Sequence, residues 1–212
     1  MRTKQTIKEG ETLRQRIETM PQDSILFRSD FPEYHAEFVG STLAALTTEG
    51  VLTKMAQGIY VKPRKSRFGD VFPSSDKVAR AIAFRDHAEV LPSGITALNA
   101  LGLSPQVPTT YTYLTTGSER TVKLMNHQLV LKRGVPKNFR YDTRLIAMLV
   151  QALRALNQEN VREEELQTIR TLILKESDQK ALTQDVAKMP AWMKRIVKPM
   201  LNKGNHGKIV AE

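Results

Sequence analysis

The residue types that most often carry catalysis occur in this sequence without the spacing that catalysis needs. The histidines lie far apart and show no paired ligand spacing, so we expect no metal site; they are His35, His87, His127 and His206. The acidic run Glu163–Glu165 occupies adjacent positions, which point in different directions on a helix, and it is typical of a solvated helix start. Ser93 lacks the frame of a nucleophile elbow and is interpreted as a helix cap. The chain has no cysteine, which excludes disulfides and thiolate zinc sites. We therefore predict that the protein is not an enzyme and needs no cofactor.

Basic and hydroxylic side chains gather instead around one helical segment and the hairpin after it, where the available chemistry is binding to a polyanion. A helix is predicted over 36–48, because Val39, Leu43 and Leu46 recur at helical spacing and form a buried stripe. Its open face then carries small or hydroxylic side chains, which allow close approach to DNA and hydrogen bonds with phosphates or bases. This face has no Arg, Asn or Gln, so base readout would depend on neighbouring residues. The residues predicted to contact DNA are Arg28, His35, Glu37, Ser41, Thr42, Lys54, Gln57, Lys62 and Arg64.

The elements around this helix predict a winged helix-turn-helix over residues 1–67. A first helix is expected from Thr6 to Met20, ended by Pro21, followed by an apolar connection and a brief helix over 31–34 capped by Ser29 or Asp30. Gly50 follows the helix over 36–48, and a hairpin around Gly58 follows in turn. In such a motif the second helix of the pair enters the major groove.

The rest of the chain predicts an α+β fold with a helical end. A polar linker is expected over 64–75, then a helix over 77–89 with Val78, Ala81 and Ile82 inward, and a helix from Gly94 to Leu101. Three strands are expected next, over 111–115, 121–125 and 128–132, and helices from about Asp142. We therefore predict a small α+β domain with an antiparallel sheet over 68–140 and a helical extension over 141–212.

The charge balance favours a nucleic-acid partner. Formal net charge is +10 and is spread along the chain. Two alternatives remain: a merely basic protein, and a winged helix that binds protein with these cations as a solvated rim. The polar amino terminus lacks the apolar core of a secretory signal, and no uninterrupted apolar run is long enough to span a membrane. We expect a soluble cytoplasmic protein with no membrane contact.

Several ordered sequence motifs resemble the AbiEi-type antitoxins and their DUF6088-like relatives, over residues 6–140. The motifs are Phe27–Phe31, Ser41–Leu46, Gly50–Leu52, Gln57–Tyr60, Leu91–Asn99, Leu101–Ser104, Gln106–Pro108 and Tyr113–Gly117. The resemblance implies the antitoxin of a type IV toxin–antitoxin system linked to phage defence. Its winged helix would bind double-stranded DNA and repress its own promoter.

The second domain of such an antitoxin would counteract a nucleotidyltransferase-like toxin, in general without a stable complex. We place the antitoxin surface at Arg120, Lys123 and Lys132, which are cations on the predicted small sheet. The alternative is a plain transcription regulator without antitoxin activity. No function is carried onto residues 141–212.

Overall fold

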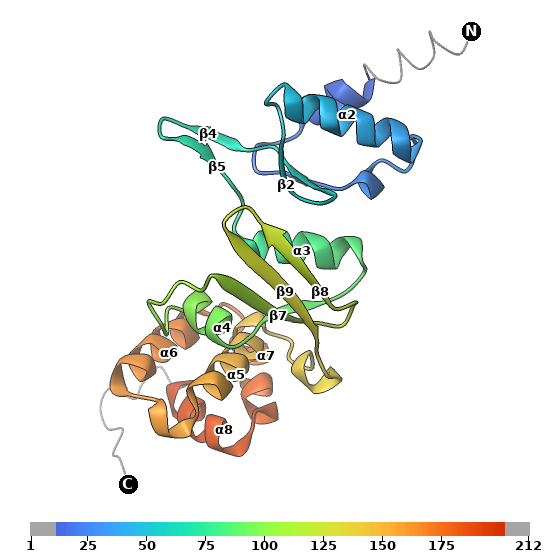
Figure 1. The fold of residues 1–212 in the computed structure, drawn as a ribbon. Coiled ribbons are helices and arrows are strands. Elements are labelled where there is room, and N and C mark those ends of the chain that lie inside the picture. Colours follow the sequence, from blue (N-terminus) through green and yellow to red (C-terminus); the bar gives the residue numbers. More distant parts are fainter. Residues whose placement is uncertain (1–11, 202–212) are drawn as a thin grey trace, which may run out of the picture. The chain divides into compact units, whose positions relative to one another are not determined.

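A computed structural model describes residues 12–201 as an α+β chain of helices and small antiparallel sheets (Figure 1). The chain forms two compact units, one of residues up to 86 with 122–128, the other of residues 87–121 with those from 129 onward. Within the described range, no helix is long and apolar enough to cross a membrane.

The first unit begins with a small core between helices and a three-stranded sheet. Its elements are a helix over 12–19, β1 (Ile25–Leu26), η1 (Arg28–Asp30), α2 (Ala36–Thr48), β2 (Thr53–Ala56) and β3 (Ile59–Val61). The strand order is β1-β3-β2 and both pairings are antiparallel. The buried residues of this core are Leu13, Ile17, Leu26, Phe31, Val39, Leu43, Leu46, Leu52 and Tyr60.

Helix α2 has the predicted bounds and the predicted buried stripe. Val39, Leu43 and Leu46 are each at most 1% exposed, so the opposite face of the helix is the open one. Gly50 lies just beyond the end at φ +76°, a conformation that costs glycine little and other residues more.

Two short segments before α2 differ from the prediction. The expected helix over 31–34 does not form, and the 3-10 turn η1 lies just before this segment, where the Asp30 carboxylate accepts a hydrogen bond from the Phe27 N–H at 2.9 Å. Asp30 thus closes a turn behind it instead of capping a helix ahead of it. The apolar connection contains strand β1, because Ile25 and Leu26 pair with the edge of β3. Residues 6–11 of the predicted first helix lie outside the described residues.

The predicted linker contains a hairpin and the start of a helix. Strands β4 (Arg64–Ser66) and β5 (Gly69–Val71) pair antiparallel. Helix α3 (Ser75–Arg85) begins two residues earlier than predicted and ends four residues earlier. Its cap is Ser74, whose hydroxyl accepts the N–H of Lys77 at 3.3 Å. Ala81 is half-buried, and Ala79 and Ala83 are buried in its place because the helix presents a different face.

A four-stranded sheet contains the three predicted strands and one more. Its order is β6-β7-β9-β8, with β6 (Val90–Pro92), β7 (Thr110–Thr115), β8 (Arg120–Leu124) and β9 (His127–Arg133). Strand β6 has no alternation because all of it is buried. Helix α4 (Ile95–Ala100) follows β6, and its N-cap position is held by Gly94, not by Ser93. Ser93 contributes only its carbonyl, which accepts the Thr96 N–H at 3.2 Å.

The second unit ends in helices that share one core with β6 and α4. These elements are η2 (Pro136–Asn138), α5 (Arg144–Leu156), η3 (Gln158–Asn160), α6 (Glu163–Lys175), α7 (Gln179–Lys188), α8 (Ala191–Val197) and η4 (Lys198–Leu201). Leu91 and Leu98 lie in the same apolar cluster as Leu149 and Ile173. Residues from both sides of the predicted boundary at 140 therefore build a single core.

Candidate functional site

The open face of α2 carries hydroxyls that are already oriented by the helix itself. Ser41 is exposed and its hydroxyl donates to the Phe38 carbonyl at 2.9 Å, and Thr48 donates to the Ala44 carbonyl at 3.2 Å. Thr42, also predicted as a contact, is half-buried and donates to the Phe38 carbonyl at 3.0 Å. Because the hydrogens are used internally, the oxygens remain acceptors suited to the amino group of a base.

An arginine from the preceding turn lies directly against α2. A Cβ placed on Gly40 would lie 2.7 Å from Nη2 and 2.8 Å from Cζ of Arg28. Gly40, which has no Cβ, therefore makes room for this guanidinium. No carboxylate in the described range pairs with Arg28, so its charge is available to an external anion.

Ion pairing separates the cations of the first unit into two groups. The first group is neutralised by carboxylates, in the pairs Arg14–Glu18, Arg14–Glu49, Arg16–Glu33, Lys65–Asp70, Lys77–Asp23, Arg80–Asp76 and Arg85–Asp86. The second group contains Arg28, Lys54, Arg64, Arg67 and Lys123, which are exposed and make no ion pair with any residue in 12–201. Of these, Arg28, Lys54 and Arg64 are among the predicted DNA contacts.

Lys62 belongs to neither group. Its ammonium donates to the carbonyls of Glu18 and Met20, the latter at 2.8 Å, at the end of the first helix. A cation there satisfies carbonyls that have no partner within the helix. This geometry gives Lys62 a structural role, and its predicted contact with DNA stays a prediction.

A hollow of about 590 Å³ brings Arg28 close to the β2–β3 turn. It is lined by Phe27, Arg28, Ser29, Gln57, Gly58, Tyr60, Arg85 and Asp86. The Arg85 guanidinium lies 4.5 Å from the centre of the Phe27 ring and pairs with Asp86 at 2.8 Å. Gln57 was predicted here, but Arg85 was not, since it lies in a helix far along the sequence. The other predicted contacts, His35 and Glu37, are exposed at the amino end of α2.

The predicted antitoxin surface is divided between two faces of the sheet. Side chains alternate along a strand, and Arg120 has the same parity as buried Leu124, whereas exposed Lys123 has the opposite parity. Lys132 is exposed and follows buried Leu131 in β9. Lys123 and Lys132 remain exposed candidates, but Arg120 is half-buried on the other face.

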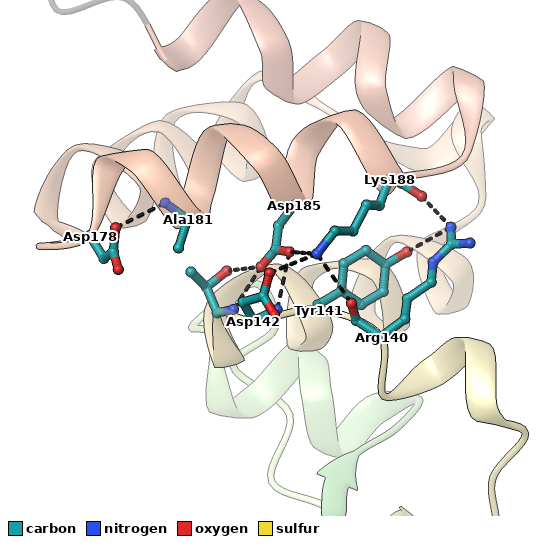
Figure 2. Close-up of polar contacts among 8 residues, drawn as sticks. Arg140, Tyr141, Asp142, Asp178, Ala181, Asp185 and Lys188 are labelled. Atoms are coloured by element: carbon teal, nitrogen blue, oxygen red, sulfur yellow. Dashed lines mark hydrogen bonds and ion pairs between the residues drawn. The ribbon is translucent and has the colours of Figure 1, made fainter.

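A polar cluster with a buried carboxylate joins α7 to the start of α5 (Figure 2). Asp185 is 0% exposed and accepts hydrogen bonds from the Asp142 N–H at 3.1 Å and from the Thr143 N–H and hydroxyl at 2.6 and 2.8 Å. Lys188 Nζ lies 2.9 Å from Asp185 and 2.7 Å from Asp142. Burial by itself raises the pKa of Asp185, but the N–H groups of Thr143 and Asp142 and the ammonium of Lys188 outweigh it, so the pKa is lowered.

This cluster has the properties of a structural link. Each acceptor oxygen of Asp185 is matched by donors, and Arg140 in turn donates to the Lys188 carbonyl at the end of α7. The carboxylate caps the amino terminus of α5 from a different helix, where a negative charge is favourable. No sequence motif marks it, because the partners are more than forty residues apart.

Ser75 and His127 form a pair whose geometry indicates a structural role. Ser75 Oγ lies 2.7 Å from His127 Nε2. Burial lowers the pKa of His127, which favours the neutral imidazole. Ser75 is only 7% exposed at the start of α3, so its hydroxyl is not open to a substrate.

Comparison with known proteins gives one family. A family model described as "Family of unknown function (DUF6088)" matches residues 12–182, from the first described helix into α7. No curated protein matches the chain. Among the residues that the structure describes, no group of three His, Asp or Glu side chains is placed to hold a metal ion.

Proposed function

We propose that this chain, which belongs to the DUF6088 family, is a cytoplasmic DNA-binding repressor of its own promoter and the antitoxin of a toxin–antitoxin pair. The proposal interprets the first unit as a winged helix-turn-helix. The order of first helix, η1, α2 and the β2–β3 hairpin supports it, with α2 as the helix that enters the major groove and the hairpin as the wing.

The observation that carries the DNA-binding role is the charge and shape of α2 and its surroundings. The helix buries one stripe completely and opens small, hydroxylic residues on the other side, and Arg28 lies against it at Gly40 without an acidic partner in 12–201. Arg28, Lys54 and Arg64 would bind phosphates, which position a protein on the duplex. Ser41 and Glu37 would accept hydrogen bonds from base amino groups.

Binding to labelled duplexes tests this role. Fluorescence anisotropy would compare the DNA upstream of the gene with a random duplex of equal length at several salt concentrations. We expect the upstream DNA to bind on the order of 10³-fold tighter or more, with affinity falling steeply as salt rises. Equal affinity for the two duplexes would contradict a repressor function.

The antitoxin role is supported by the resemblance to AbiEi-type antitoxins. We propose that Lys123 and Lys132, each exposed on its own strand, take part in counteracting a nucleotidyltransferase-like toxin. The full chain with both lysines changed to alanine should rescue toxin-expressing cells less well than the wild type at equal protein level. A matched control is the chain with Lys175 and Lys180 changed to alanine, two exposed lysines of the helical part. Equal rescue by the two double variants would show that Lys123 and Lys132 have no part in antitoxin activity.

A further inference from the structure

The turn of the β4–β5 hairpin presents an aromatic side chain to solvent. Phe68 is 86% exposed, in a segment that the sequence predicted to be a polar linker. Isolated exposed apolar residues are common, so exposure alone gives it no role. Its setting is what distinguishes it.

The hairpin turn is ordered by its own hydrogen bonds. The Ser66 hydroxyl donates to the Gly69 carbonyl at 2.7 Å and accepts the Phe68 N–H at 3.2 Å. Gly69 has φ +114°, a backbone conformation that glycine supplies at little cost. Lys65 pairs with Asp70 across the strands at 2.9 Å. The backbone that carries Phe68 is therefore ordered before any partner binds.

One cation lies against the aromatic ring, and others occupy the same hairpin. The Arg67 guanidinium lies 4.7 Å from the centre of the Phe68 ring. Lys65 is neutralised by Asp70, but Arg64 and Arg67 form no ion pair within residues 12–201. A hairpin that carries an exposed aromatic ring together with arginines that form no ion pair complements a nucleic acid, which offers base faces for the ring and phosphates for the cations. An apolar protein partner would leave these charges unsatisfied.

We infer that the β4–β5 hairpin is a second DNA-binding wing, in which Phe68 inserts against the bases of the duplex while Arg64 and Arg67 bind the flanking phosphates. This inference rests on the proposed DNA binding and adds a partner surface outside α2 and the β2–β3 hairpin. Apolar side chains inserted at a base step unstack it and bend the DNA. We therefore expect the DNA to be bent in the complex.

The test uses the full chain and a matched pair of variants. Phe84 on α3 is also 86% exposed, so Phe84→Ala removes the same side chain from an equally open position. Anisotropy measures affinity for the upstream duplex, and energy transfer between dyes on the duplex ends measures bending. Phe68→Ala should weaken binding by roughly 5- to 150-fold and reduce the bend. Phe84→Ala should match the wild type, and Arg67→Gln should lower the salt slope by about one.

The outcomes separate this inference from the proposed function. If the wild type binds the upstream duplex no better than random DNA, the repressor function fails and the inference with it. If the wild type binds specifically but Phe68→Ala keeps its affinity and bend, only the inference is overturned. Loss of toxin rescue by Phe68→Ala with unchanged DNA binding would assign the hairpin to a protein partner and overturn it as well.

Discussion

Replacing Asp185 with asparagine should lower the free energy of unfolding by about 3–5 kcal/mol at pH 7, as expected for a buried charge network that loses one partner. One carboxylate oxygen accepts from the Thr143 N–H and hydroxyl, and the other from the Asp142 N–H and Lys188. Whichever oxygen becomes the amide nitrogen, two donors lose their acceptor. Each buried donor left unsatisfied costs about 1–3 kcal/mol, so two such donors agree with the loss of about 3–5 kcal/mol expected for a broken buried charge network. The melting temperature should fall by about 6–20 °C.

The stability lost in Asp185→Asn should become smaller as the pH falls. The pKa of Asp185 is lowered in the folded protein, so its stabilisation is present above the unfolded-state pKa of about 3.9 and is lost as pH falls through the lower folded value. Denaturant unfolding followed by circular dichroism from pH 3 to 8 should show a constant difference between wild type and Asp185→Asn at neutral pH. The difference should shrink below about pH 4.

A matched control lies on the same helix. Asp178 is exposed and caps α7 by accepting the Ala181 N–H at 2.9 Å (Figure 2). Asparagine caps helices as well as aspartate, so Asp178→Asn should change stability by less than about 0.5 kcal/mol. Similar losses for the two variants, or a difference that grows at acid pH, would refute the reasoning.

Three further predictions concern the first unit. Gly40→Ala forces the flexible end of Arg28 away from α2, so the affinity for promoter DNA should fall about 10-fold. The melting temperature should hold or rise slightly, because alanine favours a helix over glycine by about 0.5–1 kcal/mol. An unchanged affinity would show that Arg28 does not contact the DNA. Lys62→Met should lower the melting temperature and leave the salt dependence of DNA affinity unchanged. Lys54→Met should lower the slope of affinity against salt concentration by about one and leave the melting temperature unchanged. The opposite pattern would make Lys62 the phosphate contact and Lys54 the structural residue. Gly50→Ala should cost about 1 kcal/mol of stability because of the positive φ, and a neutral result in thermal melting would speak against that backbone conformation.

The sequence was most informative where burial follows a regular period. The bounds of α2 were predicted to the residue because Val39, Leu43 and Leu46 repeat at helical spacing and Gly50 follows. The β4–β5 hairpin was missed because its side chains are open to solvent on both faces, so no alternation of apolar and polar residues marks it. For the same reason the sequence did not indicate that Phe68 lies in an ordered hairpin turn.

Contacts between distant residues could not be predicted from local spacing. Nothing in the sequence around Gly40 indicates that Arg28 lies against it, and nothing near Asp185 indicates that it caps a helix starting more than forty residues earlier. Lys62 was predicted as a DNA contact from its charge and its place in the hairpin, and only the fold shows that its ammonium also binds carbonyls at the end of the first helix. Composition identifies a cation, but only the fold shows whether it already has a partner.

The central claim is that the open face of α2 reads DNA, and one substitution tests it most directly. Ser41→Glu places a carboxylate on this face without touching the buried stripe. The matched control is Thr171→Glu, since Thr171 is exposed in the middle of α6, donates to the Gln167 carbonyl at 2.9 Å and gives the same change in net charge. In anisotropy titrations with the upstream duplex, Ser41→Glu should bind no better than wild type binds random DNA, while Thr171→Glu binds like wild type and both variants keep the wild-type melting temperature. Equal, promoter-specific binding by the two variants would contradict the account.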